Sequence, residues 1–95
     1  MVNRMAAKEK TEKKVTGKGK LKEDRFLILH NDDYHTFDYV IDALVDVCGH
    51  ELNQAIQCTM LVHYKGQCDV KKGSFTYLSP MRKALTDREL KATID

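Results

Sequence analysis

Apolar and polar positions follow two different periods along the chain, and the changes of period divide it into segments. The short, continuous apolar run at 26–29 predicts a buried strand over 25–30. At 67–72 the two kinds of residue alternate, with Cys68 and Val70 on one side, which predicts a half-buried strand. A short final strand is expected from Leu90 to Ile94.

Two segments between the first two strands have the spacing of amphipathic helices. In the first, six apolar residues share one helical stripe: Phe37, Val40, Ile41, Leu44, Val47 and Cys48. Thr36 is a suitable N-cap, Asp38 favours the positive end of the helix, and Gly49 ends it. The second helix is expected over about 51–64, followed by the stop residue Gly66. Its common face holds Leu52, Ala55, Ile56, Thr59, Val62 and His63.

A third helix is expected over about 75–86, where Pro80 leaves two possibilities open. Either Ser79 caps the helix and Pro80 is its first residue, or the helix runs through Pro80 with a kink. The order of elements is then β-α-α-β-α-β. Because so few strands alternate with helices, we expect an α+β fold in which a small three-stranded antiparallel sheet carries the helices on one face.

The chain of 95 residues is long enough for one domain. Its charged residues are unevenly distributed along the sequence. Residues 1–25 hold nine Lys or Arg and four Asp or Glu, whereas 26–95 hold seven and ten. Residues 1–23 have few large apolar groups, so we expect a disordered basic extension there and a folded core at 24–95. We expect no nucleic-acid partner, because the aromatic residues or charged face typical of such sites are missing.

The apolar runs and the cysteines bear on where the protein works. The longest apolar runs are only a few residues long, so we expect no membrane span. The basic N-terminus is not followed by an apolar region, so we expect no secretory signal. The three cysteines, Cys48, Cys58 and Cys68, form no Cys-x-x-Cys pair, so neither a zinc site nor a disulfide framework is indicated. We therefore expect reduced thiols in a cytoplasmic protein.

The most informative polar residues are Asn31, Asp32 and Asp33, which follow the first strand, and His63, which lies near the end of the second helix. Asn and Asp often end strands for local hydrogen-bonding reasons alone, so a purely structural role is one interpretation. If the fold brings the cluster and His63 together, two carboxylates, a carboxamide and an imidazole make a small polar site that prefers a cation.

Three kinds of chemistry remain open for this cluster. A metal site would use His30, Asp32, Asp33, His35 and His63, although no spacing places two of them on one helix face. Acid–base catalysis needs a carboxylate pair and a histidine, but no nucleophile, phosphate-binding or cofactor motif accompanies them. Capture of a cationic amine beside an apolar pocket needs only the residues that are present. We expect neither a cofactor nor an enzymatic activity.

A set of short motifs narrows these alternatives. The chain carries Asn31-Asp32-Asp33-Tyr34 after the first strand, Val40-Ile41 in the first helix, and Leu61-Val62-His63-Tyr64 before Gly66. In this order and spacing it resembles the ClpS family, the adaptors that deliver N-degron substrates to an ATP-driven Clp protease. The resemblance covers about residues 25–95 and agrees with the expected order of elements.

The resemblance implies a role for each matching polar position. Asn31, Asp32 and His63 match the family residues that hold the α-amino group and first peptide unit of a bound N-terminus. Asp33 matches the next acidic position and adds negative potential. The resemblance thereby favours capture of a cationic amine over metal binding and catalysis.

The resemblance also implies a hydrophobic pocket, formed by His35, Phe37, Val40, Thr59, Val62 and Leu90. Phe37 and Thr59 lie where the family usually has methionines, and His35 lies where a threonine is common. Phe is stiffer than Met and Thr is smaller and more polar, so the pocket volume of the family does not transfer to this chain. Leu90 matches the last wall only loosely.

The implied function is that of a cytoplasmic, non-enzymatic adaptor. By resemblance, it holds the large hydrophobic first residue of an N-degron substrate and docks on the N-terminal domain of a Clp unfoldase. That unfoldase is of the ClpA or ClpC type and passes the substrate to the ClpP protease. We expect a monomer.

Overall fold

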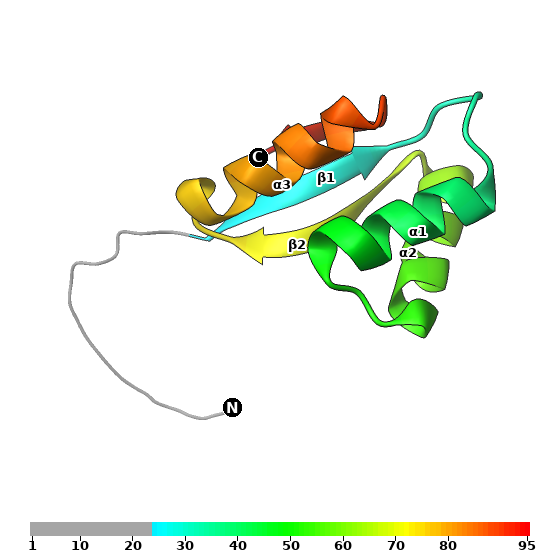
Figure 1. Ribbon diagram of the computed structural model, residues 1–95, viewed down its shortest axis with the longest axis horizontal. Coiled ribbons are helices and arrows are strands. Elements are labelled where there is room, and N and C mark those ends of the chain that lie inside the picture. The colour runs from blue at the N-terminus through cyan, green and yellow to red at the C-terminus, as the bar shows by residue number, and fades with distance from the viewer. Residues whose placement is uncertain (1–23) are drawn as a thin grey trace.

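The sheet has three antiparallel strands, and the first strand in the sequence lies between the other two (Figure 1). The computed structural model describes residues 24–95, so the predicted disordered extension lies outside the described residues. β1 is Arg25–His30, β2 is Gln67–Gly73 and β3 is Lys91–Ile94. The three-stranded antiparallel sheet predicted from the sequence is confirmed, with β2 one residue longer and β3 one residue shorter than expected.

The first two helices begin and end close to where the sequence predicts. α1 is Phe37–Cys48, and the Thr36 hydroxyl accepts a hydrogen bond of 3.1 Å from the backbone N–H of Tyr39. Its C-cap, Gly49, has a φ of 70°, a left-handed conformation that glycine adopts without strain. α2 is Leu52–Lys65, and Gly66 ends it with a φ of 91°. The caps at Thr36, Gly49 and Gly66 are local signals, which is why the sequence places these three ends to within one residue.

The third helix corrects one expectation about Pro80. α3 is Phe75–Asp87, and its N-cap is Ser74, whose hydroxyl accepts a bond of 3.1 Å from Tyr77 N–H. Pro80 therefore lies inside the helix and Ser79 does not cap it, so the first of the two possibilities is wrong. A helix that starts before a proline must give up one backbone hydrogen bond. The contacts of Leu78 and Leu85, both fully buried, anchor α3 on either side of that position.

The core joins the apolar stripes of the helices to one face of the sheet. Leu27 and Leu29 of β1 belong to a single buried cluster with residues of the other elements: Val70, Ala92, Leu44, Ala55, Leu78 and Leu85. Phe26, which alternates with these two leucines, is exposed. Figure 1 shows α3 lying along β1, while α1 and α2 pair beside β2. None of the helices within residues 24–95 is long and apolar enough to cross a membrane.

Candidate functional site

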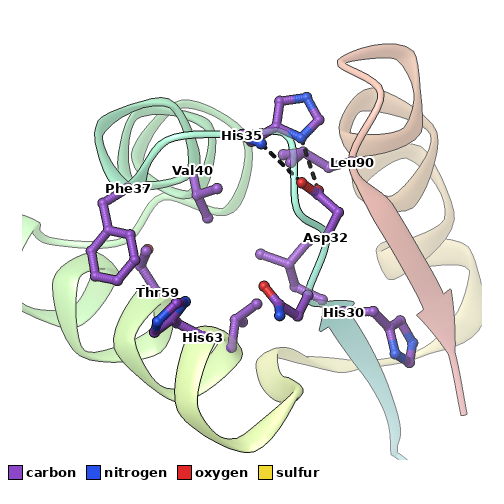
Figure 2. A pocket seen from close by; sticks show the side chains of 11 residues that line it. His30, Asp32, His35, Phe37, Val40, Thr59, His63 and Leu90 are labelled. Carbon is purple, nitrogen blue, oxygen red and sulfur yellow. Dashed lines mark hydrogen bonds and ion pairs between the residues drawn. The ribbon is translucent and has the colours of Figure 1, made fainter.

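A small pocket lies where β1 ends, between the start of α1 and the second half of α2 (Figure 2). Its volume is about 40 Å³. It is lined by Leu29, His30, Asn31, Asp32, His35, Phe37, Val40, Thr59, Val62, His63 and Leu90. Every residue that the sequence predicts for the site is therefore part of this lining, except Asp33.

Backbone hydrogen bonding brings the two halves of the pocket together. His30 is opposite Gln67 in the antiparallel pairing of β1 with β2, and β2 begins directly after α2. One residue further, the backbone N–H of Asn31 donates a hydrogen bond of 2.9 Å to the carbonyl oxygen of Gly66. The polar turn after β1 is thus attached to the C-terminal end of α2, which is why Asn31 and His63 line one pocket although 32 positions separate them in the sequence.

The Asp32 carboxylate is the anionic group of the pocket. Its Oδ1 accepts hydrogen bonds from the backbone N–H groups of Tyr34 and His35, at 2.8 and 2.9 Å. Its Oδ2 lies 2.8 Å from Nδ1 of His35. Desolvation alone would raise the pKa of Asp32, but the hydrogen bonds and charge interaction with His35, together with the bond from Tyr34, outweigh it and lower the pKa below 3.8. Asp32 is therefore ionised at neutral pH.

The walls of the pocket are apolar and come from three elements. Val40 on α1, Val62 on α2 and Leu90 before β3 are all buried. Thr59 is buried as well, and its hydroxyl donates a bond of 2.7 Å to the Ala55 carbonyl of its own helix. Because that hydroxyl already has a partner, Thr59 adds no unsatisfied donor to the pocket.

Aromatic rings form the more open side of the pocket. Phe37 and His63 meet edge to face, with ring centroids 5.2 Å apart, and His63 makes a similar contact of 4.7 Å with Tyr64. Figure 2 shows Phe37 and His63 across the pocket from Asp32 and His35. The site therefore has a carboxylate on one side, an imidazole on the other and apolar walls between them.

Two residues of the predicted set lie differently from the rest. Asp33 is exposed and is not among the lining residues. His35 belongs to the lining, but its ring is hydrogen-bonded to Asp32 and stacked on Tyr39 at 4.7 Å. It is thus a polar neighbour of the carboxylate as well as part of the pocket wall.

The arrangement does not favour the metal-binding alternative. His30 reaches the lining, but its Nε2 lies 2.8 Å from the Thr93 hydroxyl, and in Figure 2 its ring points away from Asp32. In the part of the chain that the structure describes, no three His, Cys, Asp or Glu side chains are grouped closely enough to hold a metal ion.

Sequence reasoning missed two features of the site. Leu29 lines the pocket. Successive side chains on β1 point to opposite faces of the sheet, so this position could be predicted once the face that packs against the helices is known. The pairing of Asp32 with His35 was also missed. The sequence feature that could have predicted it is the spacing of three residues between Asp32 and His35 in a strand-to-helix turn. In such turns an Asp carboxylate commonly accepts hydrogen bonds from nearby backbone groups.

None of the three cysteines is among the residues that line the pocket. Cys48 and Cys58 are buried and Cys68 is half-buried. Desolvation is the main cause that raises the pKa of Cys48 to about 11 and that of Cys68 to about 12. Since the thiolate is the reactive form, these two thiols are poor nucleophiles at neutral pH.

The sequence is similar to those of known proteins. Residues 21–93 match the family model of the ATP-dependent Clp protease adaptor protein ClpS. An adapter protein ClpS of Desulforapulum autotrophicum is 32% identical over 66 residues, which are 70% of this chain and 64% of that protein. One of Oleidesulfovibrio alaskensis is 42% identical over 48 residues, which are 48% of this chain and 46% of that protein.

A solved structure agrees with the fold. Agrobacterium tumefaciens ClpS2, determined bound to L-phenylalaninamide, has a TM-score of 0.72 to this chain at 23% sequence identity. The match covers 76% of this chain and 94% of that one. The match of the family model extends over both helices and the turn that form the pocket, as well as α3 and most of β3. The chain therefore belongs to the ClpS family of adaptors of ATP-dependent Clp proteases.

Proposed function

We propose that this protein captures the free N-terminus of substrates whose first residue is large and hydrophobic, and delivers them to a Clp unfoldase. One observation carries the proposal: Asn31, the ionised Asp32 and His63 surround a pocket whose walls are apolar. A positively charged amine with an apolar side chain on the next atom has the matching chemistry.

The hydrogen-bonding capacity of the polar groups fits a primary ammonium. Both acceptor positions of Asp32 Oδ1 are occupied by backbone N–H groups, whereas Oδ2 has one partner, His35, and keeps one position for a ligand. The Asn31 carboxamide oxygen and a ring nitrogen of His63 can supply two more acceptors. An –NH₃⁺ group has three donors, so these three groups would satisfy it.

The energies are sufficient for this kind of binding. A free α-amino group has a pKa of about 7.7–8.0, so it is mostly cationic at neutral pH. Each hydrogen bond to a charged group contributes about 1.5–3 kcal/mol, and burial of a Leu or Phe side chain adds about 1.5–3 kcal/mol. Ordering the peptide subtracts from this sum, so the strongest affinity that these contacts supply is in the micromolar range, about −8 kcal/mol. Acetylation removes the charge and most donors, so an acetylated end would bind poorly.

A large side chain can enter only if a wall of the pocket moves. A cavity of about 150 Å³ binds benzene, whereas the pocket measures about 40 Å³. Phe37 is 42% exposed, while Val40, Val62 and Leu90 are 8%, 5% and 3% exposed. Phe37 is therefore the apolar wall with the most freedom to swing outward, and we assign it the role of a gate.

The similarity to known proteins supports the proposal. L-phenylalaninamide, the ligand of the Agrobacterium ClpS2 structure, is itself a free α-amino group next to an aromatic side chain. The match to the Clp adaptor family motivates the rest of the proposal: the protein is a cytoplasmic, monomeric adaptor without enzymatic activity. It would dock on the N-terminal domain of a ClpA- or ClpC-type unfoldase and, through it, serve ClpP.

Peptide titration tests the proposal directly. Peptides that differ only in the first residue, Phe, Leu or Ala, carry a fluorophore at the C-terminus, and anisotropy reports binding to the full chain. We expect binding of the Phe and Leu peptides, much weaker binding of the Ala peptide, and loss of binding when the Phe peptide is acetylated. Equal affinity for all of these peptides would overturn the proposal.

A further inference from the structure

We propose that His35 is a positioning residue, which holds the Asp32 carboxylate in the orientation that receives the amine and makes that binding sensitive to pH. The inference deepens the proposed function and rests on it. It assigns to His35 a role beyond that of a pocket wall, carried by its contacts with Asp32 and Tyr39.

The first step of the argument is the hydrogen bonding of the carboxylate. Two backbone N–H groups fix Oδ1 of Asp32, and the His35 ring fixes Oδ2 at 2.8 Å. An ionised carboxylate only accepts hydrogen bonds, so Nδ1 of His35 must carry the proton in this contact. Both oxygens are thereby held, and the one free acceptor position on Oδ2 has a defined direction. Figure 2 shows both contacts of His35 with Asp32 as dashed lines.

The second step is what holds the His35 ring itself. The ring stacks on Tyr39 of α1, with centroids 4.7 Å apart and planes inclined by 20°. The Tyr39 hydroxyl donates a hydrogen bond of 2.8 Å to the Arg88 carbonyl, two residues before the pocket wall Leu90. The chain of contacts from Asp32 through His35 and Tyr39 to Arg88 thus connects the carboxylate to the segment that carries Leu90.

The third step concerns charge. The side chains of His35 and Asp32 are only 16% and 18% exposed, so water screens their interaction less than that of a surface pair. A neutral His35 orients the carboxylate and leaves its charge for the ammonium. A protonated His35 places a second cation beside the bound amine and competes for the same carboxylate. Binding therefore weakens when His35 gains a proton.

The effect of His35 on binding must be distinguished from the effects of other ionisable groups around the pocket. Asp32 lies in the same turn, Tyr39 is on α1, His63 is across the pocket on α2, and His30 ends β1. The Arg88 guanidinium is paired at 3.5 Å with Asp46 Oδ2, so its charge is partly balanced. Asp32 stays ionised in mild acid, because its pKa is lowered. A variant that changes only His35 separates its effect from any effect of His30 and His63.

The experiment compares wild type with His35→Asn and His35→Ala, using a free-amine Phe peptide and its acetylated form. Asn places an N–H donor close to where Nδ1 of histidine lies but cannot gain a proton, whereas Ala removes the donor. At about pH 7 we expect H35N to bind within about twofold of wild type. H35A should bind about tenfold more weakly, because a carboxylate that is not held in place must be ordered when the amine binds. Between about pH 7 and 5.5, where histidines change charge, wild type should lose about fivefold more affinity than H35N.

Each outcome decides the matter. Equal binding by H35A and wild type, with both shown by circular dichroism to be folded, overturns the positioning role. If H35A does not fold, the pH profiles of wild type and H35N decide alone, and identical profiles overturn the inference. Failure of wild type to distinguish the free peptide from the acetylated one overturns the proposed function itself. If wild type binds the free peptide and rejects the acetylated one, and H35A shows the same affinity and the same pH dependence, only the role of His35 is overturned.

Discussion

The backbone N–H of Asn31 lies 2.9 Å from the carbonyl oxygen of Gly66 and donates a hydrogen bond to it. This bond fastens the polar turn after β1 to the end of α2, three residues beyond His63. The two halves of the proposed amine site are therefore held together by main-chain atoms rather than by the side chains that line the pocket. The side chains of the pocket can vary while this attachment stays constant.

Removal of the Asp32 charge should weaken binding of free N-termini. Asp32→Asn keeps the size of the side chain but removes the charge that attracts the ammonium, and we expect the affinity for a Phe-initiated peptide to fall about ten- to hundredfold. Fluorescence anisotropy measures the loss. The matched control is Asp33→Asn, which removes the same charge one residue away, where the side chain does not line the pocket. Equal losses for the two variants would mean that Asp32 acts only through long-range potential.

Truncation of the proposed gate should change which side chains fit. Phe37→Ala opens the exposed wall of the pocket, so Trp-initiated peptides should gain affinity relative to Leu-initiated ones by about fivefold or more, as expected when steric exclusion is removed. A competition series with Leu, Phe, Tyr and Trp N-termini measures this ratio. Phe75→Ala is the control, because Phe75 is also a half-exposed aromatic but lies on α3 outside the pocket lining. An unchanged ratio in Phe37→Ala would contradict the gate.

Gly66 should be sensitive to substitution although it has room for a side chain. Its φ is 91°, and no atom lies within 4 Å of a Cβ placed there. Gly66→Ala should therefore lower the free energy of unfolding by about 1–2 kcal/mol through backbone strain alone. Urea unfolding measures the change, and Lys65→Ala, an exposed neighbour in the same helix end, should be nearly neutral by comparison.

Acid should remove a contribution of Asp32 to stability. Desolvation raises the pKa of Asp32, but the hydrogen bonds from His35 and Tyr34 outweigh it, so the pKa of the folded state lies below the ordinary 3.8. A lowered pKa means that folding favours the ionised form, so the contribution is fully present above 3.8 and disappears as the pH falls through the lower value. The difference in unfolding free energy between wild type and Asp32→Asn should shrink below that pH. A difference that stays constant down to strong acid would show that the ionised carboxylate has no such role.

Much of the fold could be predicted because its signals are local. Thr36 and Gly49 delimit α1 through hydrogen bonds and a left-handed φ that involve only nearby residues, and the sequence places both ends correctly. Pro80 is the exception. Its ring disfavours a helix interior, but the buried contacts of Leu78 and Leu85 and the cap at Ser74 hold α3 across it. Packing against the sheet, which no local pattern contains, overrides the local preference.

By itself the sequence determined the order of elements, both caps of α1, the C-cap of α2, and the motifs at Asn31 and His63 that resemble the ClpS family. Only the tertiary structure decided that these motifs meet, because strand pairing and the bond from Asn31 to Gly66 join segments distant in the chain. It also decided that Asp32 lines the pocket while the adjacent Asp33 faces solvent, and that the His35 ring lies against the carboxylate. Neighbouring residues in a turn point in directions that depend on backbone angles and packing, and residue type alone carries neither.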